Sequence, residues 1–177
     1  GCAVRCIIYL SYIGDFIILL KYSCYFKIII YVLLIFMTMN NVLNILLVED
    51  NMIEIMKIKR TITLLNLNHK VIEAKNAEEA LLFLQNSSIN PDIILLDLNM
   101  PKISGIEFLS VLKNCKKLSY IPTIILTTSN NQKDILECYR LGISGYILKP
   151  LKFDDYVKKI EATLNYWCHN EFIVSTS

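Results

Sequence analysis

The sequence predicts an α/β protein with a doubly wound, five-stranded parallel sheet in the strand order 2-1-3-4-5. Two observations support this fold class. After Met39, short apolar runs alternate with longer segments in which apolar residues recur at helical spacing, as in repeated β-α units. The runs at 93–96 and 124–126 are apolar at every position, which is typical of central parallel strands covered by helices on both faces.

The individual elements follow from the same pattern. The strands are expected at 44–48, 70–74, 93–96, 123–126 and 146–148. The helices are expected at 51–66, 77–86, 105–113, 132–141 and 153–165. Asn76 with Glu79 three residues later indicates a helix N-cap, Gly142 follows a helix end, and Pro91 closes a polar loop.

The apolar excess of the chain lies at its N-terminus. Hydrophobic residues make up 54% of the 177 residues and the mean hydropathy is +0.46, but the most apolar part precedes Met39. Charged residues interrupt this part, and its longest stretch without charge or strong polarity, 28–37, is shorter than the roughly 20 residues needed to cross a bilayer. Three interpretations stay open: translated sequence upstream of a start at Met37 or Met39, a marginal membrane anchor, or another kind of tail.

We therefore expect three parts: an apolar N-terminal segment (1–39), one domain (40–168) and a C-terminal tail (169–177). A net charge of +2 and a pI near 8.2 give no signature of a nucleic-acid or anionic-membrane partner. The six cysteines form no CxxC pair and no zinc-type spacing, so we expect reduced, structural thiols and a cytoplasmic location.

Acidic residues follow two of the predicted strands. Glu49 and Asp50 come directly after the first strand, and Asp97 comes directly after the third. In the predicted strand order these carboxylates meet at the carboxyl edge of the sheet, where they repel one another unless a cation joins them. Hard oxygen ligands favour Mg²⁺ over zinc or softer metals. The sequence therefore predicts a Mg²⁺ site at this edge.

Two further side chains converge on that edge. Thr127 ends the fourth strand, and Lys149 ends the fifth strand just before a proline. A carboxylate, a metal, a hydroxyl and an ammonium at one point are suited to phosphoryl transfer, because the transferred group needs cations and hydrogen-bond donors around it. Asp97 is central among them and is the expected nucleophile.

With these motifs in place, the sequence resembles the receiver domain of two-component response regulators (the CheY-like superfamily) over 44–167. The segments that carry the resemblance are 45–51, 92–101, 124–129 and 145–150. The Leu-Thr-Thr-Ser run, the Lys-Pro-Leu and the final Tyr166-Trp167 resemble small receiver-only regulators, including those paired with phytochrome-type histidine kinases. The resemblance implies the flavodoxin-like (βα)5 fold.

The resemblance also implies a role for each site residue. Mg²⁺ would be held by Glu49, Asp50, Asp97 and the backbone carbonyl of Asn99. Asp97 would form the acyl phosphate, and Thr127 and Lys149 would bind the phosphoryl oxygens. Tyr146 would turn inward when Thr127 moves, and the Lys149–Pro150 bond would be cis. Glu49 departs mildly from the family, in which many members have Asp at that position.

The resemblance implies partners as well. They are a sensor histidine kinase or a histidine phosphotransfer protein, a downstream protein target, and a second copy of the chain in a homodimer. Because only a short tail follows Trp167, no output domain is expected, and the chain would catalyse only its own phosphorylation and dephosphorylation. The family's signalling surface would include Ile135, Tyr139, Tyr146, Phe153 and Tyr156, of which composition favours Ile135 and Tyr139 as core or half-buried residues.

The same residues also bear on four alternative functions. Within the family, the domain could be a phosphorelay intermediate. A flavodoxin-like FMN protein needs a Ser/Thr/Gly-rich phosphate cradle where Glu49 and Asp50 stand. A Mg²⁺-dependent aspartyl-phosphate phosphatase resembles its relatives in an Asp-x-Asp motif, whereas this chain has Asn99 at the second position. A receiver-like scaffold that takes no phosphate is disfavoured, because Asp97, Thr127 and Lys149 are all present.

Overall fold

A computed structural model describes residues 27–28, 42–87 and 89–173. The chain divides into two compact units, 1–40 and 41–177. Of the first unit only Lys27 and Ile28 are described, as exposed helical residues, so the expectations for 1–39 lie almost wholly outside the described part. Within that part, no helix has the length and apolar character that a membrane span requires.

The second unit contains the predicted sheet. Its strands are β1 (Asn44–Val48), β2 (Lys70–Ala74), β3 (Ile93–Leu96), β4 (Thr123–Thr127) and β5 (Gly145–Leu148). All neighbouring pairs are parallel, and the order is β2-β1-β3-β4-β5. The predicted fold class and strand order are therefore confirmed.

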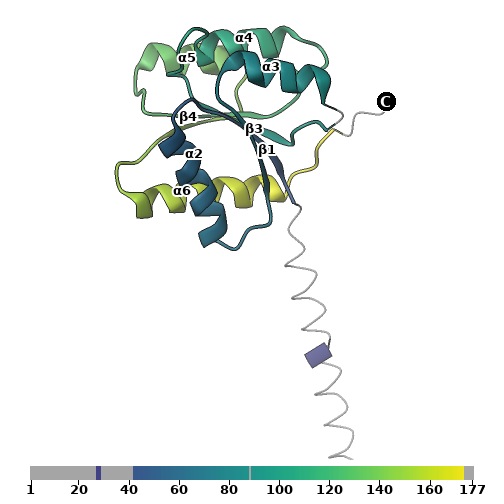
Figure 1. Ribbon diagram of the computed structural model, residues 1–177, viewed down its shortest axis with the longest axis vertical. Coiled ribbons are helices and arrows are strands. Elements are labelled where there is room, and N and C mark those ends of the chain that lie inside the picture. The colour runs from purple at the N-terminus through teal and green to yellow at the C-terminus, as the bar shows by residue number, and fades with distance from the viewer. Residues whose placement is uncertain (1–26, 29–41, 88, 174–177) are drawn as a thin grey trace, which may run out of the picture. The chain divides into compact units, whose positions relative to one another are not determined.

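The helices lie in two layers (Figure 1). α2 (Met52–Leu64) and α6 (Phe153–Cys168) cover one face of the sheet, whereas α3 (Ala77–Asn86), α4 (Gly105–Asn114) and α5 (Gln132–Arg140) cover the other. The bounds of α6 differ most from expectation. It runs three residues beyond 165, because Cys168 continues the buried stripe of residues at four-residue spacing.

The interior strands contribute side chains to two separate hydrophobic cores, one on each face of the sheet. Along β1, Leu46 and Val48 pack under α3 and α4, whereas Ile45 and Leu47 pack against α2 and α6. β3 repeats this alternation, and its four side chains are all buried. Because both faces are apolar, a shift in strand register would exchange the two cores without exposing a polar face, so helix packing must hold the register.

Local capping follows the sequence signals. The Asn76 side chain accepts the backbone N–H of Glu79 at 2.8 Å, and Gly142 has a φ of 87°, as a helix-ending glycine does. A capping box at Ser104 and Glu107, with both reciprocal hydrogen bonds, begins α4 and was not among our expectations. The Ser-x-x-Glu spacing was its signal.

Three expectations are corrected. Tyr156 is 1% exposed and lies in the core under α6, so it is not part of an outer surface, because its ring continues the buried stripe of that helix. Tyr139 is 54% exposed, since it falls beside the single buried position of α5. The described peptide bonds are all trans, Lys149–Pro150 included. The trans isomer is intrinsically preferred by about 0.5–1 kcal/mol.

Gly105 is required by a close approach of backbone. A Cβ placed on it would meet the carbonyl oxygen of Asp97 at 2.3 Å and the Cα of Leu98 at 2.7 Å. We expect Gly105→Ala to lower the free energy of unfolding by about 1–3 kcal/mol through this overlap. Gly145→Ala is the control, because its Cβ would meet only the Ile124 side chain at an ordinary 3.6 Å. Denaturant titration measures both, and an equal loss in the two variants would contradict the prediction.

The boundary near residue 40 remains a prediction, and truncation tests it. The buried residues of both cores all lie within 43–168, and Phe172 packs against one of them. A chain from Asn40 onward should therefore keep the unfolding midpoint and the Mg²⁺ affinity of the full chain. Aggregation of the shorter chain, or loss of its metal binding, would show that the first 39 residues belong to the domain.

Candidate functional site

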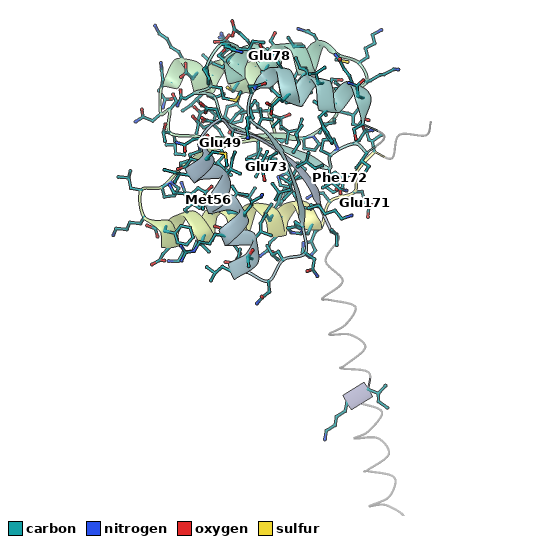
Figure 2. All side chains as sticks on the ribbon, in the orientation of Figure 1. Glu49, Met56, Glu73, Glu78, Glu171 and Phe172 are labelled. Atoms are coloured by element: carbon teal, nitrogen blue, oxygen red, sulfur yellow. The ribbon has the colours of Figure 1, made fainter. Side chains whose placement is uncertain are left out.

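The site lies at the carboxyl edge of the sheet, where backbone pairing continues one residue past the strands. The N–H of Asp97 donates to the carbonyl of Val48 at 3.0 Å, and the N–H of Lys149 donates to the carbonyl of Thr127 at 2.8 Å. These bonds place Asp97 beside Glu49 and Lys149 beside Thr127. Figure 2 shows Glu49 near the start of α2, at this edge. The structure thus brings the predicted residues together from β1, β3, β4 and β5.

Three carboxylates form the acidic cluster of Glu49, Asp50 and Asp97. One oxygen from each lies within 4.8 Å of the others. Glu49 and Asp97 are 2% and 5% exposed, whereas Asp50 is open to solvent. Asp97 Oδ1 is buried and accepts no hydrogen bond. A hard-oxygen donor set with one open side and one unpartnered buried oxygen fits a divalent cation such as Mg²⁺.

Lys149 supplies the compensating positive charge. Its side chain is 6% exposed, and its Nζ lies 2.6 Å from Glu49 Oε2 and 3.7 Å from Asp97 Oδ1. The other Glu49 oxygen accepts the N–H of Asn51 at 3.3 Å. Burial raises the pKa of the Glu49 carboxyl, and the hydrogen bond from Lys149 opposes that shift. In this structure the ammonium is therefore held mainly by Glu49.

A fourth carboxylate, that of Glu54, was missed by sequence reasoning. Glu54 lies in the first turn of α2, with its Oε2 at 3.9 Å from Lys149 Nζ and its Oε1 at 2.6 Å from Lys57 Nζ. The signal was an acidic residue one helical turn beyond the Asp50-Asn51 cap, on the same chain segment as the acidic cluster. By itself this position also suits a favourable helix-dipole contact, so the sequence could not decide its role.

Tyr156 lies near these charges from the side of α6. Its hydroxyl is buried and has no hydrogen-bond partner. Burial, with smaller contributions from the charges of Glu54 and Glu49, raises the pKa of Tyr156 far above its ordinary value. The hydroxyl therefore keeps its proton and can act only as a neutral donor or acceptor.

Thr127 connects the acidic cluster to β5. It is fully buried, and its Oγ1 accepts the Asn99 side-chain amide and the N–H of Ser129, both at 3.3 Å. The Tyr146 hydroxyl donates to the carbonyl of Ser129 at 2.9 Å. Burial raises the pKa of that hydroxyl, which keeps it a donor. A continuous set of contacts thus runs from Thr127 through Ser129 to Tyr146.

Asn99 is an exposed residue two positions after Asp97. Besides Thr127, its side-chain amide donates to the Thr128 hydroxyl at 3.2 Å. These bonds tie the loop after β3 to the end of β4. The metal contact expected of the Asn99 backbone carbonyl stays a prediction.

Three cysteines lie in the described part, on or next to helices α4, α5 and α6. Cys115 and Cys138 are free thiols, and burial is the main cause that raises the pKa of Cys138, to about 11. Cys168 Sγ lies 3.4 Å from His69 Nε2 at the end of α6. The expectation that these thiols are reduced and structural stays a prediction.

Comparison with known proteins agrees with this geometry. The response regulator receiver domain family matches residues 45–161. Response regulator Rcp1 of Synechocystis sp. is 34% identical over 106 residues, which are 57% of this chain and 72% of that protein. A probable methanogenesis regulatory protein, FilR2 of Methanothrix harundinacea, is 39% identical over 77 residues, which are 44% of this chain. The chain spans half the length of FilR2.

Solved structures show the same likeness. The phosphorylated cyanobacterial phytochrome response regulator RcpA superposes with a TM-score of 0.68 at 32% identity, covering 72% of this chain and 95% of RcpA. The Mn²⁺-bound form of Rcp1 has the same TM-score at 30% identity, covering 75% and 99%. Fold, acidic cluster and family match agree: this chain belongs to the response regulator receiver domains of two-component systems, which bind a divalent metal ion.

Proposed function

We propose that Asp97 accepts a phosphoryl group from a histidine kinase while Glu49, Asp50, Asp97 and the Asn99 carbonyl hold Mg²⁺. The observation that carries the proposal is the unpartnered oxygen of Asp97, buried beside two other carboxylates and 3.7 Å from Lys149 Nζ. A carboxylate oxygen with no hydrogen bond keeps its lone pairs free to attack an electrophile, and the nearby cation favours the negative charge of the transferred group.

The proposed reaction forms one bond and breaks one bond at phosphorus. The Asp97 carboxylate attacks the phosphorus of a phosphohistidine; a P–O bond forms, the P–N bond breaks, and the electron pair leaves with the imidazole. Bound Mg²⁺ would supply charge neutralisation to the phosphoryl oxygens. Lys149 would move from Glu49 toward a phosphoryl oxygen, and the Thr127 hydroxyl would donate to another.

The signal would leave the site through β5. We infer that a Thr127 hydroxyl bonded to phosphate releases the N–H of Ser129, to whose carbonyl Tyr146 is anchored. Tyr146 then changes its position at the surface, as a shift between two populated states. The readers of this change would be a downstream protein or, in a relay, a histidine phosphotransfer protein. The chain would catalyse only its own phosphorylation and dephosphorylation, in the cytoplasm, where free thiols such as Cys138 persist.

Substitution of Asp97 tests the acceptor directly. Incubation with acetyl phosphate and Mg²⁺ should add one phosphoryl mass to the wild type and none to Asp97→Asn, because the amide is not a nucleophile here. Asp154→Asn, which changes an exposed acid on α6, is the control and should label like the wild type. Intact-protein mass spectrometry reads the result, and labelling of Asp97→Asn would place the acceptor elsewhere.

Metal binding should stabilise the fold. The repulsion within the acidic cluster is relieved when a cation joins it, so Mg²⁺ at about 100 times its dissociation constant should add about 2.7 kcal/mol to the free energy of unfolding. Asp50→Asn should lose most of this gain, and Glu78→Gln, on the exposed side of α3, should retain it. Thermal unfolding with and without Mg²⁺ measures the difference. An undiminished gain in Asp50→Asn would remove Asp50 from the ligand set.

Thr127 and Lys149 should separate switching from chemistry. With the phosphate mimic beryllofluoride, the Tyr146 ring resonances should shift in the wild type and much less in Thr127→Ala, which keeps its nucleophile and should still be phosphorylated. Lys149→Ala should lose the switch altogether, because the full charge that grips the phosphoryl group is gone. NMR of the aromatic rings provides the measurement. Equal shifts in the wild type and Thr127→Ala would show that the hydroxyl is not the coupling element.

A further inference from the structure

Glu54 has a buried oxygen that the proposed reaction does not use. The side chain is 16% exposed, and its two oxygens differ in their surroundings. Oε1 is bonded to Lys57 Nζ at 2.6 Å, whereas Oε2 is buried and accepts no hydrogen bond. A carboxylate oxygen in that condition costs free energy unless a positive charge compensates it. Lys149 Nζ lies 3.9 Å from this oxygen.

Lys149 cannot remain without a counter-ion either, because its side chain is 6% exposed. Among the described residues, its ion pairs are with Glu49, Asp97 and Glu54. Glu49 and Asp97 belong to the acidic cluster and would be occupied by the metal. Glu54 is outside that cluster. Once a metal draws the charge of Glu49 and Asp97, Glu54 is the carboxylate that remains for Lys149.

We propose that Glu54 is a positioning residue for Lys149: it holds the ammonium in the metal-bound, unphosphorylated state and competes with the phosphoryl group for it. This inference rests on the proposed function of Asp97. Lys149 then has three successive partners, Glu49 before the metal binds, Glu54 after it binds, and the phosphoryl oxygens after transfer. The strength of the Glu54 contact sets how readily Lys149 reaches the phosphoryl group.

Lys57 moderates this competition. It is 37% exposed and shares the Glu54 carboxylate with Lys149 from the solvent side. If the Lys57 ammonium is removed, the Glu54 carboxylate attracts Lys149 more strongly. The phosphoryl group must then compete against a stronger ion pair between Glu54 and Lys149. Loss of Glu54 and loss of Lys57 therefore have opposite effects on the phosphorylated state, although both break the same 2.6 Å ion pair. A purely structural role for that ion pair would give effects of the same sign.

The test is beryllofluoride binding in the presence of saturating Mg²⁺, measured by isothermal titration on the full chain. Glu54→Gln keeps the shape of the side chain and should bind beryllofluoride about threefold more tightly, the size expected when a partly buried ion pair is lost. Lys57→Met should bind it more weakly than the wild type. Glu73→Gln is the control. It breaks an ion pair between Glu73 on β2 and Lys59 on α2 and should bind beryllofluoride like the wild type. Mg²⁺ affinity is measured first for each of the four proteins, so that Mg²⁺ is saturating in every beryllofluoride titration.

Each outcome is decisive. Unchanged or weaker binding by Glu54→Gln, while the wild type binds, would overturn the positioning role and leave the proposed function standing. Changes of the same sign in Glu54→Gln and Lys57→Met would also overturn it, by showing that the ion pair is structural. If Glu54→Gln does not fold, weaker binding by Lys57→Met supports the role and unchanged or tighter binding rejects it. Failure of the wild type itself to bind beryllofluoride would overturn both the role and the proposed function.

Discussion

The rest of this structure depends on one constraint: three largely buried carboxylates surround one buried ammonium, that of Lys149, at the edge of a parallel sheet. Glu49, Asp97 and Glu54 are each within 4 Å of Lys149 Nζ, and Asp50 completes the acidic side. The negative charge exceeds the positive charge there. Such an excess is costly away from water, and it is relieved by a divalent cation. The need for metal is therefore a consequence of how the site is charged.

The sheet is what makes this charge cluster tolerable. The backbone bonds that continue past β3 and β5 hold the backbone of Asp97 and Lys149, so their Cα atoms cannot move apart without breaking strand pairing. The two apolar cores hold that pairing from both faces. Gly105 allows the chain after β3 to return against the carbonyl of Asp97, which closes the loop on that side. The stability of the cores thus offsets the repulsion stored in the site.

The same arrangement makes the site responsive. Lys149 Nζ lies within 4 Å of three carboxylates but is hydrogen-bonded to Glu49 at 2.6 Å, while Asp97 and Glu54 lie at 3.7 and 3.9 Å. Thr127 similarly accepts two donors, one from the loop after β3 and one from the loop after β4. A new charged group at Asp97 would redistribute both sets of contacts. Redistribution among existing partners is a short-range event, yet the bond between Tyr146 and Ser129 extends it to β5.

The sequence by itself determined the sheet, its strand order and the residues gathered at its edge. The apolar runs in β3 and β4 do not alternate with polar residues. In a chain of this length, such runs indicate parallel strands that are buried on both faces. Strand ends then locate Glu49, Asp97, Thr127 and Lys149, because the carboxyl ends of parallel strands meet at one edge. Helix caps, such as that of Asn76, could likewise be predicted from the sequence.

Only the tertiary structure decided which partners these groups have. Lys149 prefers Glu49, one hundred residues away in the chain, over Asp97, and it also meets Glu54. The burial of Tyr156 and the exposure of Tyr139 likewise depend on how α6 and α5 are rotated against the sheet. The spacing of apolar residues indicates which face of a helix packs on the sheet, but it does not determine the individual side-chain contacts. The contacts arise from packing between distant segments, for which the spacing of residues along the chain carries no information.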